Sequence, residues 1–256
     1  MGMPVVIHVR DEQVPTEAVD AAFAWLRWVD AVFSTYRADS EIARLNRGEL
    51  AERDADPLVQ EVLDACRALR ERTGGAFDAE AAARMAEVRV RPGAGAGRPG
   101  AVEPAGYVKG WAAAKAWELL EQAGARNALV DAGGDLLVRG RPAPGERWRV
   151  GIQHPREDGR VAAVLELGDM AVATSGTYRR GRHIVDPASG AAPCEVVSVT
   201  CVGRDLAVAD ALATAGFAMG RAGAAWLAVQ PDVEAMVILD DDTVQFTPGF
   251  DALRVS

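Results

Sequence analysis

The stretch KGWAAAKAWELLEQAGARNALVDAGGDLLVRG, residues 109–140, contains a helix and a pair of strands in direct succession. Lys109–Ala123 consists mainly of alanine, leucine, glutamate and lysine, which are strong helix formers, and Gly124 is typical of the position just beyond a helix. Two short apolar runs follow, Asn127–Val130 and Leu136–Arg139, and the double glycine between them favours a tight turn. A helix followed by a hairpin-like strand pair favours an α+β fold.

The rest of the chain extends this pattern on both sides. Short apolar runs predict further strands at Val5–Arg10, Trp148–Ile152, Val161–Leu167, Met170–Ala173, Val196–Val202, Ala235–Leu239 and Val244–Phe246. Apolar stripes predict further helices at Thr16–Val32, Pro57–Arg72, Leu206–Met219 and Ala222–Val229, with Thr16 as a helix cap and Thr73-Gly74-Gly75 as a terminator. Because strict βα alternation is missing, we predict an α+β architecture of mixed, largely antiparallel sheets with packed helices.

The chain is long enough to build a full hydrophobic core, since it has 256 residues of which 49% are hydrophobic. The segment RVRPGAGAGRPG, residues 89–100, is rich in glycine, proline and alanine and has no apolar period. The charge balance does not change across this segment, so we interpret it as an internal excursion. We therefore expect one domain over residues 1–256, with a Gly/Pro-rich internal loop near residues 89–105.

Composition disfavours several classes of partner and site. A formal net charge of -9 disfavours nucleic acid, because binding to phosphates requires a clustered surplus of lysine and arginine. The widely spaced Cys66, Cys194 and Cys201 form no CxxC pair, which favours a reducing compartment and disfavours a structural zinc site. The opening residues MGMPVVIHVR lack the features of a secretory signal, and no window reaches the length of a membrane span. We expect a cytoplasmic protein without membrane insertion.

Two candidate positions lie in the opening stretch. A lysine in the first turn of a helix, as predicted for Lys109, is unfavourable by roughly 0.3–1 kcal/mol unless an anion is near, which points to a bound phosphate. A solvated lysine is the alternative interpretation. The sequence DAGGD, Asp131–Asp135, joins two strands and does not open a helix, so a dinucleotide-binding GxGxxG motif is excluded by context. It predicts either a simple tight turn or a close approach of the backbone to a bulky group.

A third candidate lies in ADALATAGFAMG, residues 209–220. Asp210 and Thr214 are four residues apart and so share one face of the predicted helix, among apolar or small neighbours. A carboxylate and a hydroxyl supply hard oxygen ligands suited to magnesium. The alternative is that Asp210 caps the helix and that Thr214 is simply buried.

The fourth candidate is His183, in SGTYRRGRHIVDPASG, residues 175–190. An imidazole with an ordinary pKa near 6.5 suits a general base, and hydroxyl groups lie close by in the sequence. A Ser175, His183 and Asp186 triad can be drawn, but the chain has no GxSxG elbow, and triads are defined in space. A purely structural histidine is the alternative.

Taken together and in order, these features resemble the FAD:protein FMN transferases, the ApbE-like flavin transferases. The resemblance runs nearly end to end. It is carried by Met1-Gly2-Met3, FSTYRADSEIARLN (residues 33–46), GGAFD (74–78), VKGWA (108–112), DAGGD (131–135), WRVGIQHP (148–155), AVATSGTYRRGRHIVDPASG (171–190) and VADALATAGFAMG (208–220). It implies the ApbE-like flavin transferase fold across the chain. The chain resembles a shortened branch, because the family commonly has a longer segment, with TVxPL and tryptophan motifs, after GAFD.

The resemblance also implies roles for individual residues. Asp210 and Thr214 match side-chain ligands of Mg²⁺, with the Gly106 carbonyl as a third ligand. Lys109 and Glu103 match positions that contact FAD, and the family commonly has aspartate where Glu103 stands. His183 matches the histidine that deprotonates the acceptor hydroxyl. Further residues are implied to line or shape the flavin site, namely Met1, Asp78, Gly133, Gly134, Ser175 and Tyr178.

The activity that the resemblance implies is a Mg²⁺-dependent transfer of the FMN half of FAD to a threonine or serine hydroxyl of a target flavoprotein, with release of AMP. Its partners would be FAD and an acceptor flavoprotein that carries a Thr/Ser flavinylation motif. Two other functions remain open from the sequence. One is a Mg²⁺-dependent FAD pyrophosphatase, in which water replaces the protein hydroxyl, and the other is a flavin-binding protein without catalysis.

Overall fold

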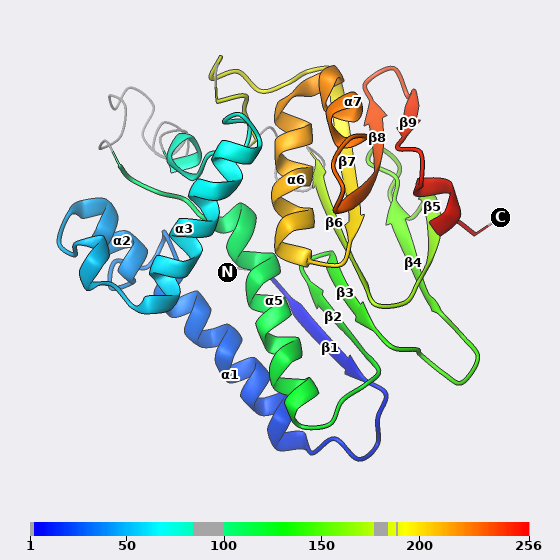
Figure 1. Ribbon diagram of the computed structural model, residues 1–256, viewed down its shortest axis with the longest axis horizontal. Coiled ribbons are helices and arrows are strands. Elements are labelled where there is room, and N and C mark those ends of the chain that lie inside the picture. Colours follow the sequence, from blue (N-terminus) through cyan, green and yellow to red (C-terminus); the bar gives the residue numbers. More distant parts are fainter. Residues whose placement is uncertain (1–2, 84–99, 177–183, 188, 256) are drawn as a thin grey trace.

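A seven-stranded antiparallel sheet lies at the centre of the protein (Figure 1), and the predicted α+β class is confirmed. The structure is a computed structural model that describes residues 3–83, 100–176, 184–187 and 189–255. The strand order is β1-β2-β3-β6-β7-β8-β9, and every neighbouring pair is antiparallel. The strands are β1 (Val5–Val9), β2 (Ala128–Ala132), β3 (Asp135–Arg139), β6 (Met170–Gly176), β7 (Val196–Gly203), β8 (Val233–Leu239) and β9 (Val244–Phe246). A separate hairpin consists of β4 (Trp148–Gln153) and β5 (Val161–Leu167).

Helices and the β4–β5 hairpin cover opposite faces of this sheet (Figure 1). The α-helices are α1 (Thr16–Phe33), α2 (Glu41–Arg47), α3 (Pro57–Arg72), α5 (Ala105–Gln122), α6 (Leu206–Ala218) and α7 (Gly223–Leu227), and residues 79–83 are also helical. Three 3₁₀ turns complete the described elements at Glu52–Asp54, Gly220–Ala222 and Phe250–Leu253. No helix in the described part of the chain is long and apolar enough to cross a membrane.

The alternation of side chains along each strand divides the interior into two cores. The helix-side core includes Ala171 and Ala173 of β6, whereas Val172 between them belongs to the hairpin-side core. Small strand residues on the helix side leave room for α6, whose sequence LAVADALATAGFA is buried almost throughout. A helix that is apolar on nearly every face must be enclosed on nearly every face. A carboxylate within α6 is therefore held in the interior.

A close crossing between α5 and α6 fixes where their polar residues meet. A Cβ atom on Gly110 of α5 would lie 2.6 Å from the Leu206 carbonyl carbon and from the Ala207 nitrogen of α6. Glycine is the residue that allows backbones to approach this closely. The neighbouring Lys109 is consequently directed to the same region as Asp210, one turn further along α6.

Several expected boundaries differ from the structure. Thr16 is the first residue of α1 and does not cap it, because Pro15 holds the cap position and no side chain there accepts a hydrogen bond. The helix predicted from Lys109 begins four residues earlier, at Ala105, whose amide donates to the Glu103 carboxylate at 3.2 Å. The expected loop near residues 89–105 thus ends at Pro104, and residues 84–99 lie outside the described part. The helix expected at Ala222–Val229 is shorter at both ends, because Ala222 belongs to the preceding 3₁₀ turn and α7 ends at Leu227.

Candidate active site

A cavity of about 1160 Å³ gathers most of the residues that the sequence singled out. It lies where the β2–β3 turn, the last residues of β6, the start of α5 and the middle of α6 come together. The predicted residues that line it are Asp78, Glu103, Gly106, Lys109, Gly133, Gly134, Ser175, Asp210 and Thr214. Met1, Tyr178 and His183 lie outside the described residues. The residues on either side of the segment 177–183, Gly176 and Ile184, both line the cavity.

One lysine and two buried carboxylates form a charged group in the wall of the cavity. The Lys109 ammonium is ion-paired with Asp135 and lies 3.5 Å from the Asp210 carboxylate. Asp135 and Asp210 are only 2% and 3% exposed, and the Lys109 side chain is 18% exposed. Lys109 is therefore not the solvated lysine of the alternative interpretation. It belongs to the second turn of α5, and its charge is balanced by carboxylates from β3 and α6.

Asp135 is a site residue that the sequence reasoning missed. DAGGD predicted the turn, but no role was assigned to the aspartate that follows it. The available signal was a carboxylate at the start of the apolar run LLV, where a buried strand position normally excludes an unpaired charge. Its Oδ1 atom accepts a hydrogen bond from the Thr174 amide at 3.0 Å.

Two hydroxyl groups and the start of α5 meet at the wall of the same cavity. Thr214, one turn beyond Asp210 on α6, has its hydroxyl 3.2 Å from the Ser175 hydroxyl of β6. A Cβ atom on Gly106 would lie 3.7 Å from the Thr214 hydroxyl, so the start of α5 closely approaches this residue. Asp210 does not cap α6, because the Asp205 side chain accepts from the Ala207 and Val208 amides and fills that role.

These groups fit a magnesium ion by the chemistry of their oxygen atoms. No cluster of three or more His, Cys, Asp or Glu side chains that could hold a metal is found among the described residues. The expected set, a carboxylate of Asp210, a hydroxyl of Thr214 and a carbonyl of Gly106, does not require such a cluster. Hard cations prefer oxygen donors of these kinds and commonly keep several water ligands.

The β2–β3 turn brings the backbone close to the N-terminal segment. Gly133 and Gly134 have φ values of 68° and 96°, which a tight two-residue hairpin turn requires and glycine readily adopts. The Gly134 amide donates to Asp131 at 2.7 Å, and a Cβ atom on Gly133 would lie 2.8 Å from the Met3 sulfur. DAGGD is therefore a tight turn, as one interpretation predicted, and Met3 packs against its backbone. The close approach of a bulky group to this turn stays a prediction.

Glu103 and Asp78 are held by different partners at the cavity wall. Glu103 accepts a hydrogen bond from the Thr35 hydroxyl at 2.8 Å, which joins the loop after α1 to the loop before α5. Asp78 accepts from the Glu80 and Ala81 amides, so it caps the helical residues 79–83. Its other oxygen atom lies 3.3 Å from the Arg70 guanidinium.

The surroundings of Asp210 also affect a neighbouring thiol. Burial raises the pKa of Cys201 on β7, and the negative charge of Asp210 raises it further. The Cys201 thiol is therefore neutral at ordinary pH. Asp186, the third residue of the triad considered for His183, accepts a hydrogen bond from the Ser189 hydroxyl at 2.8 Å.

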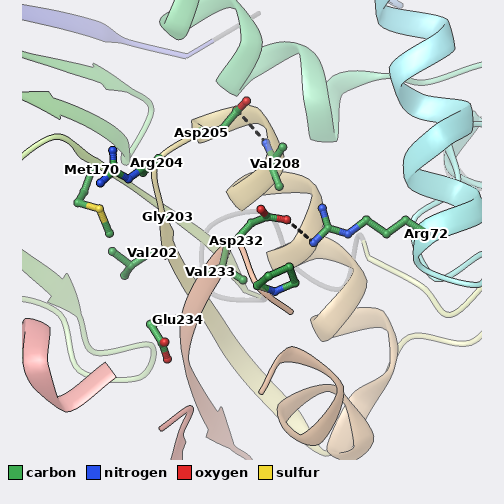
Figure 2. Close-up of a pocket in the computed structure, with 11 residues that line it drawn as sticks. Arg72, Met170, Val202, Gly203, Arg204, Asp205, Val208, Asp232, Val233 and Glu234 are labelled. Atoms are coloured by element: carbon green, nitrogen blue, oxygen red, sulfur yellow. Dashed lines mark hydrogen bonds and ion pairs between the residues drawn. The ribbon is translucent and has the colours of Figure 1, made fainter. Parts of the chain in front are cut away.

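A second cavity, of about 540 Å³, adjoins the first turn of α6 (Figure 2). Arg72, Asp232 and Asp205, three of its charged residues, form ordinary surface interactions. Arg72 lies 2.6 Å from Asp232, with side chains 31% and 52% exposed, and Asp205 caps α6 through the Val208 amide at 3.1 Å. The larger cavity, with its buried charges, is therefore the stronger candidate for chemistry.

Comparisons of sequence agree with these observations. The sequence model described as the ApbE family matches residues 1–101 and 82–237. An FAD:protein FMN transferase of Treponema pallidum is 30% identical over 93% of this chain and 82% of its own length. An FAD:protein FMN transferase of Vibrio cholerae is 34% identical over 52% of this chain, and the match spans only 43% of that relative.

Solved structures share the fold over nearly the whole chain. The crystal structure of the ApbE protein of Thermotoga maritima has a TM-score of 0.86 at 24% identity and covers 100% of this chain and 97% of its own. The structure of the flavin transferase ApbE of Vibrio cholerae has a TM-score of 0.84 at 25% identity and covers 99% and 96%.

Proposed function

This chain belongs to the ApbE family, and from that membership we propose that it transfers the FMN half of FAD to a hydroxyl group of an acceptor protein. In the proposed reaction a threonine or serine oxygen of the acceptor forms a bond to the phosphorus of the FMN half. The pyrophosphate bond on the other side of that phosphorus breaks, and AMP leaves. The acceptor would be a flavoprotein that presents a Thr/Ser flavinylation motif.

The observation that carries the proposal is the charged group of Lys109, Asp135 and Asp210 at the wall of one large cavity. A volume of about 1160 Å³ exceeds what most drug-sized ligands need, in line with an extended dinucleotide. The Lys109 ammonium would lie against the pyrophosphate and orient it. Positioning and charge stabilisation are the main demands of phosphoryl transfer.

Asp210, Thr214 and the Gly106 carbonyl would hold the magnesium ion. When bound, the ion would neutralise pyrophosphate oxygen atoms and so lower the repulsion that an incoming oxygen meets. Ser175 supports this placement, because its hydroxyl lies 3.2 Å from the Thr214 hydroxyl and restricts the rotation of that side chain. Glu103, tied to Thr35, would form the opposite wall of the FAD site.

His183 would accept the proton of the acceptor hydroxyl. Hydroxyl groups are almost wholly protonated at neutral pH, so a base placed beside one adds roughly 10²- to 10⁴-fold in rate. The role of His183 rests on the family resemblance. It is supported by the residues that flank segment 177–183, because Gly176 and Ile184 both line the cavity.

Incubation with FAD, Mg²⁺ and an acceptor protein carrying the family's target motif tests the proposal. We expect the acceptor to gain the mass of one FMN group covalently, and we expect His183→Ala to reduce that gain strongly. No adduct, on an acceptor that another family member modifies, would overturn the proposal. Free FMN and AMP formed without acceptor would indicate a pyrophosphatase. Metal-independent FAD binding that His183→Ala leaves unaltered would indicate a binding protein.

A further inference from the structure

We propose that Asp135 is a positioning residue that holds the Lys109 ammonium away from Asp210, so that the Asp210 carboxylate stays available to a divalent cation. This inference rests on the proposed function, because it takes Asp210 as a metal ligand. It adds a residue to which neither the sequence motifs nor the family resemblance assigned a role.

The Asp135 side chain is fixed at the end of the pairing between β3 and β6. The β3–β6 ladder pairs Leu136 with Val172 and ends there, so Asp135 lies just beyond its last pair. In place of a backbone carbonyl, the Asp135 Oδ1 atom accepts the Thr174 amide at 3.0 Å. One oxygen atom of Asp135 thus bonds the backbone of β6, and the other oxygen atom pairs with the Lys109 ammonium.

The Lys109 side chain is fixed from the other side by its helix. Gly110 sits against the α6 backbone, which sets the distance between the start of α5 and Asp210. The ammonium lies between the two carboxylates, and the shorter contact is the one with Asp135. Lys109 thus lies closer to Asp135 than to Asp210, whose carboxylate, 3.5 Å from the ammonium, is its second ion-pair partner.

The charges explain why this closer pairing with Asp135 matters. Among the residues that the structure describes, this group of two carboxylates and one ammonium has one surplus negative charge, and its side chains are between 3% and 18% exposed. A divalent cation at Asp210 would reverse this imbalance, and charges interact strongly where exposure is low. Without a charge on residue 135, the remaining carboxylate near Lys109 in this group would be Asp210. The ammonium would then compete with the metal for the same oxygen atoms.

The test measures Mn²⁺ binding by electron paramagnetic resonance, in the absence of flavin and acceptor. Asp135→Asn keeps an oxygen atom for the Thr174 amide but removes the charge, and we expect Mn²⁺ to bind about 10- to 100-fold more weakly, the range typical for residues that orient a metal ligand. Adding Lys109→Met to Asp135→Asn removes the competing ammonium. We expect this double variant to recover affinity to within a few-fold of the wild-type protein, which loss of structure alone would not produce.

Asp169→Asn is the matched control, because Asp169 likewise accepts a backbone amide at a strand end, from Gly140 at 2.8 Å. It should bind Mn²⁺ like the wild-type protein, and thermal unfolding verifies that each variant is folded. Unchanged affinity in Asp135→Asn overturns the inference. So does a double variant that stays as weak as Asp135→Asn, or a wild-type protein that binds no Mn²⁺. FMN transfer by the wild-type protein, measured separately, decides the proposed function independently.

Discussion

The two cavities beside α6 contain the same kinds of charged groups in opposite settings. In the larger one, Lys109 faces two carboxylates whose side chains are 3% and 4% exposed. In the smaller one, Arg72 faces Asp232, and both side chains reach solvent (Figure 2). A solvent-exposed ion pair contributes about 0–1 kcal/mol, whereas buried charges carry a desolvation cost that packing alone does not offset. In the described part of the chain, the larger of the two cavities is the one that carries this cost, which is a mark of a functional site.

The largest effect that the comparison predicts is loss of activity on changing Asp210. Asp210→Asn keeps the size of the side chain but removes the charge that a metal ligand needs. We expect FMN transfer to fall by about 10³-fold or more, since a bound metal supplies several kcal/mol of charge stabilisation. Rates measured across a Mg²⁺ titration check this.

Asp232→Asn at the smaller cavity is the control and should leave the rate unchanged. A rate and Mg²⁺ dependence in Asp210→Asn equal to those of the wild-type protein would show that Asp210 is not a ligand. The larger cavity would then be no stronger a candidate for the active site than the smaller one.

The next effect concerns stability. Lys109→Met leaves two buried carboxylates without their ammonium, and breaking a buried pair in this way costs about 3–5 kcal/mol. Arg72→Met removes a cation from an exposed pair and should cost about 1 kcal/mol or less. Urea unfolding of both variants compares the two cavities directly.

Added Mg²⁺ should change the stability losses of these two variants by different amounts. A cation that binds only the folded protein raises its stability. We therefore expect Mg²⁺ to restore part of the loss in Lys109→Met and to have little effect on the loss in Arg72→Met. Equal losses in the two variants, with equal responses to Mg²⁺, would contradict the electrostatic interpretation.

A smaller effect is expected where α5 crosses α6. In Gly110→Ala the new methyl group would meet the Leu206 and Ala207 backbone at 2.6 Å. Alanine improves helix propensity by roughly 0.5–1 kcal/mol, but overpacking against backbone costs about 1–3 kcal/mol, so the net change should be destabilising. Thermal unfolding measures it. Gly168→Ala is the control, because its Cβ atom would meet only the end of the Arg147 side chain at 3.6 Å. A stabilised Gly110→Ala would contradict the close crossing.

How much of the molecule the sequence could predict depends on how local the signal is. Pro57–Arg72 was predicted with the boundaries that the structure has, because Pro57 opens the helix and glycines follow its end. The seven-residue helix Glu41–Arg47 was missed. It is too short for a clear apolar period, and it is held partly by contacts with distant residues, such as the hydrogen bond from the Asn46 side chain to the Val102 carbonyl at 2.9 Å.

The same distinction applies to the site. Asp210 and Thr214 could be paired from their spacing alone, because residues four apart share a helix face. Asp135 could not be assigned a role, because its partner Lys109 lies on another element and the two meet only through the packing of α5 against β3. Contacts between a strand end and a helix leave no periodic trace in the sequence. The sequence thus indicated Lys109 and Asp210 separately, and their grouping with Asp135 became visible only in the structure.

The smallest predicted effect is a pH dependence of stability. It tests whether burial in the protein interior penalises a charged group. Cys66, in the helix-side core, is an ionisable group that burial keeps neutral, and burial raises its pKa to about 12 from an ordinary value of 9.0. A pKa that is higher in the folded protein stabilises it fully below pH 9.0, and that stability is lost as the pH rises toward 12. Each pH unit in this window should cost about 1.4 kcal/mol for this thiol.

Urea unfolding at pH 8 and pH 10 should therefore show a smaller loss of stability in Cys66→Ala than in the wild-type protein, by about 1 kcal/mol. Cys194→Ala is the control, because Cys194 is exposed, and its loss should match that of the wild-type protein. Equal losses in all three proteins would mean that the helix-side core admits a charged thiolate. In that case burial would impose little cost on charge there, and the buried carboxylates beside Lys109 would no longer need a cation to explain them.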